Sequence, residues 1–158
     1  MSRTPIVAGN WKMNLLRAEA LELARAVRAR CAGIARVETV ICPPYVFLHE
    51  ARGIVEGSPV LVGAQDAYPE EKGAFTGEVS ITQVAEAAHY VILGHSERRQ
   101  YFGETDESVN RRVKAALAHA VKPIMCVGET LDERNAGRTE EVLVRQTRAG
   151  IDAIEINP

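Results

Sequence analysis

The chain has 158 residues, of which 46% are hydrophobic and 25% charged, and its formal net charge is −2. This length and apolar content are enough for one domain with a buried core. The balance of 19 basic and 21 acidic residues argues against a general attraction to nucleic acid, and the lack of a long apolar run argues against a membrane span. Three cysteines without close pairing favour a reducing compartment, so we expect a cytoplasmic protein.

Short apolar runs recur along the chain and predict strands. Each run is continuous rather than alternating, which is typical of parallel strands covered on both faces. Between the runs, apolar residues recur at spacings of three and four, which predicts helices. The predicted strands are residues 6–9, 39–42, 60–63, 90–93 and 124–127.

Helix starts are marked by side chains that can accept hydrogen bonds from the first-turn amides. Ser80 and Thr130 each begin a capping-box pattern, and Thr105 precedes two acidic residues that suit the positive end of a helix dipole. Thr139 is predicted to cap a further helix after a break at residues 135–137. These signals complete a β-α pattern that occurs five times.

One irregular insertion, residues 65–80, interrupts this pattern. It contains Pro69, Gly73 and Gly77 and has no hydrophobic periodicity. Long loops within compact domains are usually functional, so we expect the insertion to have a role of its own.

The alternation predicts an α/β fold with about five parallel βα units. Such units form either an open doubly wound sheet or most of a closed barrel. No Gly-x-Gly-x-x-Gly pattern follows the first strand, which weighs against a dinucleotide-binding sheet. Polar clusters instead follow the first, fourth and fifth strands, a distribution that favours strand ends converging on one axis.

Two of these clusters contain the residue types needed for chemistry on a small anion. The first is NWKMN at residues 10–14, and the second is GHSERR at residues 94–99. Lys12 could instead be a solvated charge or an imine-forming lysine, and Glu97 could belong to an ion-pair cluster. We assign that structural role to Arg98 and Arg99, with Glu104 as a possible partner. A metal site is a weak alternative because His95 and Glu97 lack a third ligand at useful spacing.

Four segments together resemble the triosephosphate isomerase family. They are AGNWKMN at 8–14, GAFTGE at 73–78, GHSERR at 94–99 and CVGE at 126–129. The resemblance implies a (βα)₈ TIM barrel, which typically needs about 250 residues. Residues 1–158 are therefore expected to be the amino-terminal portion of a single TIM-barrel domain. The segment that carries the family's catalytic glutamate base is absent from this chain.

The resemblance also implies an activity and roles for particular residues. The family interconverts dihydroxyacetone phosphate and glyceraldehyde 3-phosphate through an enediolate, without a metal or organic cofactor. Lys12 is implied as a cation facing the phosphate and the developing oxyanion, and Asn10 as a hydrogen-bond donor to substrate. His95 is implied as a neutral electrophile, and Glu97 as the residue that orients Lys12.

The resemblance further implies a homodimer, in which Phe75 and Thr76 of the insertion contact a second subunit. Two functions remain open. The first is a triosephosphate isomerase, for which this chain supplies the lysine and histidine half of the site. The second is a non-catalytic partial barrel that acts as an assembly or complementation fragment.

The isolated chain is expected to be inactive, with Glu129 the first residue to consider if it were not. We also expect unpaired edges on the first and fifth strands, and apolar residues exposed on the inner face of the sheet.

Overall fold

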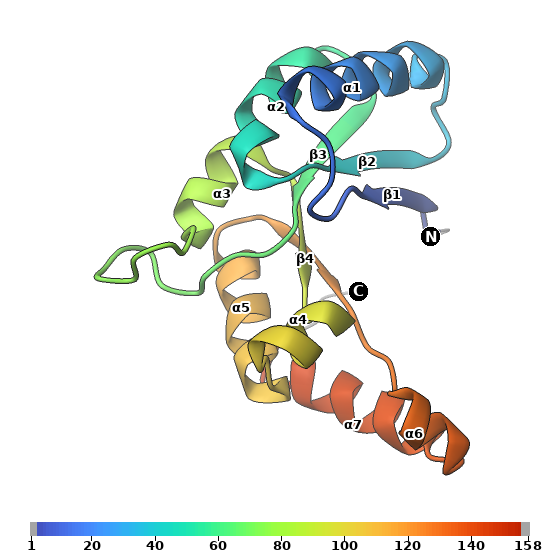
Figure 1. Cartoon of the computed structure of the whole chain (residues 1–158), viewed down its shortest axis with the longest axis vertical. Coiled ribbons are helices and arrows are strands. Elements are labelled where there is room, and N and C mark those ends of the chain that lie inside the picture. Colours follow the sequence, from blue (N-terminus) through green and yellow to red (C-terminus); the bar gives the residue numbers. More distant parts are fainter. Residues whose placement is uncertain (1–2, 156–158) are drawn as a thin grey trace.

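The computed structural model describes residues 3–155, in which parallel strands form one curved sheet (Figure 1). The strand order follows the sequence, and every strand pairs in parallel with its sequence neighbours. The predicted architecture of about five parallel βα units is thereby confirmed as a half-barrel. The strands are β1 (Ile6–Asn10), β2 (Glu38–Cys42), β3 (Val60–Ala64), β4 (Tyr90–Leu93) and β5 (Lys122–Met125).

Helices connect successive strands and cover the outer face of the sheet (Figure 1). No helix within residues 3–155 is long and apolar enough to cross a membrane. The helices are α1 (Arg17–Cys31), the short 3₁₀ helix η1 (Tyr45–Phe47), α2 (Leu48–Val55), α3 (Ile81–Ala87), α4 (Ser96–Phe102), α5 (Asp106–Ala118), α6 (Leu131–Asn135) and α7 (Thr139–Gly150).

Three of the four predicted caps are confirmed. Ser80, Thr105 and Thr130 each accept a hydrogen bond from a first-turn amide, of α3, α5 and α6 respectively. The expectation for Thr139 is wrong, because Arg138 occupies the position before α7 and makes no side-chain cap. The Thr139 hydroxyl instead donates to Glu129, 3.4 Å away, so it is used between elements rather than within its own helix.

The fifth strand begins two residues earlier than its apolar run predicts. Lys122 and Pro123 are not an apolar pair, yet they lie in register with Tyr90 and Val91 of β4. Beyond the other end of the strand, the backbone amide of Gly128 donates a hydrogen bond to the side-chain oxygen of Gln146, at 2.8 Å. Strand pairing with β4 therefore sets the bounds of β5, and hydrophobicity alone missed them.

The sheet has apolar layers on both faces. Its outer face packs against α1, α2, α3 and α5 in the main core. On the inner face Val40, Cys42, Tyr90 and Ile92 are at most 5% exposed, so the expectation that the inner face exposes its apolar residues is wrong for the middle strands. The curvature of the sheet packs these inward-facing side chains against one another. Gly63 permits this approach, since a Cβ there would lie 2.8 Å from the sulfur of Cys42.

The first strand departs from the expectation of burial on both faces. Ile6 is 50% exposed and Val7 is 63% exposed, although both belong to an apolar run. Within the described residues, β1 pairs only with β2 and β5 only with β4. The two outer strands therefore each have an open edge, as predicted, and β1 lacks neighbours to cover it.

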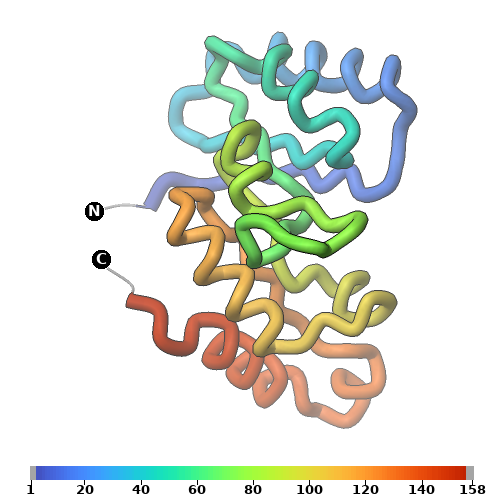
Figure 2. Tube along the Cα trace, turned by 90° about the vertical axis from the view of Figure 1, so that its left-hand side faces the viewer, coloured from blue at the N-terminus to red at the C-terminus, as the bar shows by residue number. Residues whose placement is uncertain are grey.

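The insertion between β3 and α3 projects away from the sheet (Figure 1). Figure 2 looks onto this side and shows the insertion between the half that carries α1 and α2 and the half that carries α4 to α7. It is held at its base by paired backbone bonds, in which Tyr68 donates to Val79 at 2.8 Å and Ile81 donates to Tyr68 at 3.0 Å. The base of the insertion is thus fixed by backbone hydrogen bonds, and the rest of it projects from the fold.

Candidate active site

The candidate site lies where β1 and β4 end. Asn10 is the last residue of β1 and Lys12 follows it, while His95 and Glu97 follow β4. The Lys12 ammonium reaches the Glu97 carboxylate with an Nζ–Oε1 distance of 2.6 Å. Two strands separate β1 from β4 in the sheet, so this contact depends on the curvature of the half-barrel.

Lys12 has an unusual backbone conformation, with a positive φ of 53°. For a non-glycine residue this left-handed conformation costs about 1–3 kcal/mol and persists only where the surroundings hold it. Here the Lys12 amide donates to the side chain of Asn10 at 2.9 Å. The Gln65 amide group donates to the Lys12 carbonyl at 2.9 Å and to the Cys42 carbonyl at 2.8 Å. These contacts fix the direction in which the ammonium leaves the backbone.

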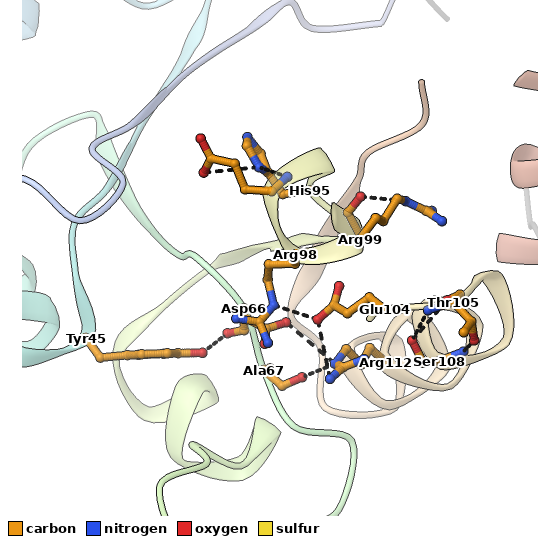
Figure 3. A network of polar contacts seen from close by, with 12 residues as sticks. Tyr45, Asp66, Ala67, His95, Arg98, Arg99, Glu104, Thr105, Ser108 and Arg112 are labelled. Carbon is orange, nitrogen blue, oxygen red and sulfur yellow. Dashed lines mark hydrogen bonds and ion pairs between the residues drawn. The ribbon is translucent and has the colours of Figure 1, made fainter. Parts of the chain in front are cut away.

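His95 occupies the N-cap position of α4, where the chain changes from strand to helix (Figure 3). Its Nδ1 accepts a hydrogen bond from the backbone amide of Glu97 at 3.2 Å. A nitrogen that accepts carries no proton, so this arrangement requires a neutral ring with its proton on Nε2. The Nε2 atom is then the donor that His95 presents to a ligand.

Glu97 links the two halves of the site. The hydrogen bond from Lys12 lowers the pKa of Glu97 below its usual range, and the positive charge of Lys12 acts in the same direction. Its second carboxylate oxygen lies 3.5 Å from Nδ1 of His95. The Lys12 and Glu97 side chains are 50% and 42% exposed in this chain, so their ion pair adds little stability. Its effect is to orient the lysine.

Glu129 follows β5 by four residues, and its carboxylate is already paired with another side chain. Its carboxylate accepts from Arg134 at 2.7 Å, and its side chain is 6% exposed. Hydrogen bonding from its own backbone amide, followed by that from Arg134, lowers the pKa of Glu129. A carboxylate stabilised in its ionised form and already paired is a poor proton acceptor. Glu129 is therefore not placed as a catalytic base.

The structure brings Asn10, Lys12, His95 and Glu97 together and leaves Phe75 and Thr76 apart. Phe75 lies in the projecting insertion, is 41% exposed, and has its ring 4.5 Å from that of Tyr68. Thr76 is exposed beside it. Within this chain neither residue reaches the strand ends.

Sequence reasoning missed Gln65 as a member of the site. It appeared only as the first residue of the insertion, yet it binds the Lys12 backbone. A usable signal was present, because Gln65 is the first polar residue after the apolar third strand. The same rule identified Asn10 and His95, and applying it to every strand would have identified Gln65 as well.

A buried ion-pair network supports the helix that follows His95 (Figure 3). Arg98 pairs with Glu104 at 2.6 Å, as predicted, and with Asp66 at 2.9 Å. A terminal nitrogen of Arg112 lies 3.4 Å from the same oxygen of Glu104 that Arg98 binds. Burial raises the pKa of Asp66 to about 6, and nearby Glu104 adds to this effect against the opposing charges of Arg98 and Arg112. The network joins the base of the insertion to α4 and α5.

A metal site finds no support among the residues that the structure describes. No group of three His, Cys, Asp or Glu side chains in residues 3–155 is placed to hold an ion. The site instead combines the Lys12 cation, the His95 imidazole and the Asn10 amide with the Glu97 carboxylate that pairs with Lys12. The first three can donate hydrogen bonds to an anion and to oxygen atoms that gain negative charge.

Comparison with known proteins identifies relatives along nearly the whole chain. The family model described as triosephosphate isomerase matches residues 5–158. A triosephosphate isomerase from Moorella thermoacetica is 50% identical over 154 residues, covering 97% of this chain and 61% of the relative. One from Endomicrobium trichonymphae is 48% identical over 150 residues, covering 94% of this chain and 60% of the relative.

A solved structure agrees with this similarity. The crystal structure of triosephosphate isomerase from Bartonella henselae superposes with a TM-score of 0.91 at 36% identity. The match covers 97% of this chain and 64% of that chain. The present chain thus spans about three fifths of the length of the curated relatives that it matches.

Proposed function

This chain belongs to the triosephosphate isomerase family, and from that premise we propose that it supplies the lysine and histidine half of a site that interconverts dihydroxyacetone phosphate and glyceraldehyde 3-phosphate. The observation that supports the proposal best is the contact among Lys12, Glu97 and His95 at converging strand ends. A triose phosphate has an anionic phosphate group and two oxygen atoms on adjacent carbons, one of them a carbonyl oxygen. The site has a cation for the former and an imidazole donor for the latter.

The proposed mechanism follows from where charge develops. Removal of a carbon-bound proton next to a carbonyl produces an enediolate, which concentrates negative charge on oxygen. Preorganised donors in a water-poor site stabilise such charge most effectively. Lys12 would supply a fixed positive charge, Asn10 a hydrogen bond, and the Nε2–H of His95 a donor between the two carbon-borne oxygens. Glu97 would keep Lys12 directed at the substrate.

We assign the proton-abstracting base to a part of the barrel outside this chain. The carboxylates that follow β3, β4 and β5 are already engaged, Asp66 with Arg98, Glu97 with Lys12 and Glu129 with Arg134. We propose residues 1–158 as the amino-terminal portion of one TIM-barrel domain, in the cytoplasm, working in glycolysis and gluconeogenesis. We also propose a homodimer when the barrel is complete, with Phe75 and Thr76 at the contact.

The decisive experiment compares this chain with a completed barrel. The completed barrel joins this chain to the remaining part of the Moorella thermoacetica relative, purified from a host that lacks its own isomerase. A coupled assay should detect isomerase activity in the completed barrel and none in this chain alone. A completed barrel that is inactive, although circular dichroism shows it to be folded, would contradict the proposed activity. Turnover by this chain alone would contradict the proposal that the base lies outside it.

A second candidate function is a non-catalytic partial barrel that acts in assembly or complementation. The engagement of Glu97 and Glu129 favours it, because neither of these carboxylates is then free to act as a base. The mass of the natural product separates the two functions. A species near the length of the relatives supports the isomerase, and a species of 17.3 kDa supports the assembly module.

A further inference from the structure

Arg99 makes an unusual set of contacts one helical turn after His95. Its Nε donates to the carbonyl of Gly94 at 2.9 Å, and one terminal nitrogen lies 3.4 Å from the carbonyl of Cys126. These carbonyls belong to the residues that follow β4 and β5. One guanidinium therefore joins the ends of two neighbouring strands, at the level where His95 begins α4.

The position of the guanidinium is itself fixed. Its other terminal nitrogen donates to Asp106 at 2.6 Å, and the two side chains are only 16% and 10% exposed. The second oxygen of Asp106 is paired with Arg145 of α7 at 3.3 Å. Arg99 is thereby held by α5 and α7, two elements that do not contribute to the candidate site.

The backbone at Gly94 lies close against the Arg99 guanidinium. Gly94 has a positive φ of 69°, and a Cβ at this residue would lie 3.0 Å from the Arg99 guanidinium and 2.8 Å from Val109. The next residue is His95, and its carbonyl accepts the backbone amide of Arg99 at 3.1 Å. Arg99 thus binds two successive carbonyls of this turn, that of Gly94 through its side chain and that of His95 through its backbone amide.

We propose that Arg99 is a positioning residue, which holds the turn at residues 94–95 against the end of β5 and so fixes the place of the His95 ring. The consequence for catalysis rests on the proposed function. A planar guanidinium can bind two carbonyls and a carboxylate at once, whereas a lysine ammonium can satisfy the charge but not this geometry. The arginine is needed for its shape as well as its charge.

The test uses Arg99→Lys and Arg99→Gln in the completed barrel. A misplacement of about 1 Å can cost about 100-fold in rate, so we expect kcat to fall about 10- to 100-fold in both variants with KM little changed. Stability should separate them. Arg99→Lys retains the charge opposite Asp106 and should unfold near the parent midpoint, whereas Arg99→Gln should unfold earlier. A purely structural arginine would move kcat and stability together.

Arg98→Lys is the matched control. Arg98 is the adjacent residue and is also partly buried, but its side-chain contacts are the carboxylates of Asp66 and Glu104. This variant should lower stability and leave kcat essentially unchanged. Parental kcat in Arg99→Lys, or an equal loss of kcat in Arg98→Lys, would overturn the proposal.

Two measurements keep the inference independent of activity. Hydrogen exchange should be faster at the amides of residues 95–97 in both Arg99 variants, and the side-chain nitrogen-15 signals of His95 should shift or broaden. Unchanged exchange and unchanged imidazole signals would reject the positioning role even if the rates fell. If the parent barrel has no isomerase activity, the proposed function fails while these two measurements still decide the role of Arg99.

Discussion

Lys12 supplies the positive charge of the candidate site from a residue with a strained backbone conformation. Its positive φ is held by Asn10 and Gln65, which bind its amide and its carbonyl. The backbone sets the direction in which the Lys12 side chain starts, and the ion pair with Glu97 holds its ammonium in place. Replacing the lysine removes the charge without removing the turn that presents it.

We expect Lys12→Met to abolish most activity of the completed barrel. Loss of one preorganised group that stabilises a developing oxyanion costs about 100- to 1,000-fold in kcat. Lys114→Met, on the helix α5, is the control and should retain parental rates. Steady-state kinetics of the two variants provide the comparison. Equal activity of Lys12→Met and the parent would remove Lys12 from the mechanism, and a borohydride-trapped adduct on Lys12 would indicate imine chemistry instead.

Asp66 gives a second prediction at the residue scale, concerning pH. Its pKa is raised from 3.8 to about 6, so the folded state binds a proton more tightly than the unfolded chain does. The contribution of this group to stability is therefore fully present below about pH 4 and is lost as the pH rises through about 6. Between pH 7.5 and 5, this linkage should stabilise the parent by about 1 kcal/mol relative to Asp66→Asn.

The measurement is chemical denaturation of the completed barrel at a series of pH values. The asparagine variant lacks the titrating group, so its curve should rise less steeply on acidification. Glu22→Gln, at an exposed position on α1, is the control and should follow the parent. Parallel curves for Asp66→Asn and the parent would show that this carboxyl does not titrate differently on folding.

At the scale of elements, the insertion between β3 and α3 is joined to the rest of the fold mainly near its base. Its base is fixed by backbone bonds and by the buried network around Asp66, while Phe75 remains 41% exposed. Exposed apolar surface on a projecting loop is a common feature of surfaces that bind other proteins. This combination supports the proposal of a subunit contact.

Deleting residues 74–76 from the completed barrel should convert a dimer to a monomer and lower activity. The deletion removes the apolar tip and leaves the base of the insertion in place. Sedimentation velocity measures the change in mass, and the coupled assay measures the change in rate. Leu117→Ser removes an exposed apolar side chain from α5 and should leave the dimer intact. A deletion variant that remains dimeric would place the subunit contact elsewhere.

At the scale of the whole molecule, the half-barrel has two open strand edges. A parallel sheet normally has both faces covered and few free edges, because unpaired backbone groups pair readily with other chains. Here β1 is also apolar and exposed, with Val7 at 63%. The inner-face side chains of Val40, Cys42, Tyr90 and Ile92 are buried against one another. The edge strands are therefore the part of the sheet that is open to pairing with other chains.

We therefore expect this chain alone to self-associate, and the association to depend on the edge. Light scattering should show assemblies whose size grows with concentration, and Val7→Lys should reduce them because a charge on an edge strand opposes pairing. Adding the remaining part of the Moorella thermoacetica relative as a separate polypeptide should also reduce them. A monodisperse monomer at high concentration would contradict this view of the edges.

The sequence by itself determined the local and periodic features of this protein. Apolar runs located all five strands, and side-chain caps at Ser80, Thr105 and Thr130 located three helix starts. Polar residues directly after strands located Asn10, Lys12, His95 and Glu97. These features are local in the chain, since they depend on the spacing of neighbouring residues and on hydrogen bonds that close within one turn.

Only the tertiary structure decided features that join distant parts of the chain. The bounds of β5 came from its pairing with β4, and Thr139 was drawn to Glu129 instead of capping its own helix. Gln65 became part of the site because it binds the carbonyl of Lys12, 53 residues away. Arg99 gained its position because it binds carbonyls that follow two different strands. Sheet curvature sets these contacts, and curvature arises from the packing of all strands and helices together. No short stretch of sequence encodes it.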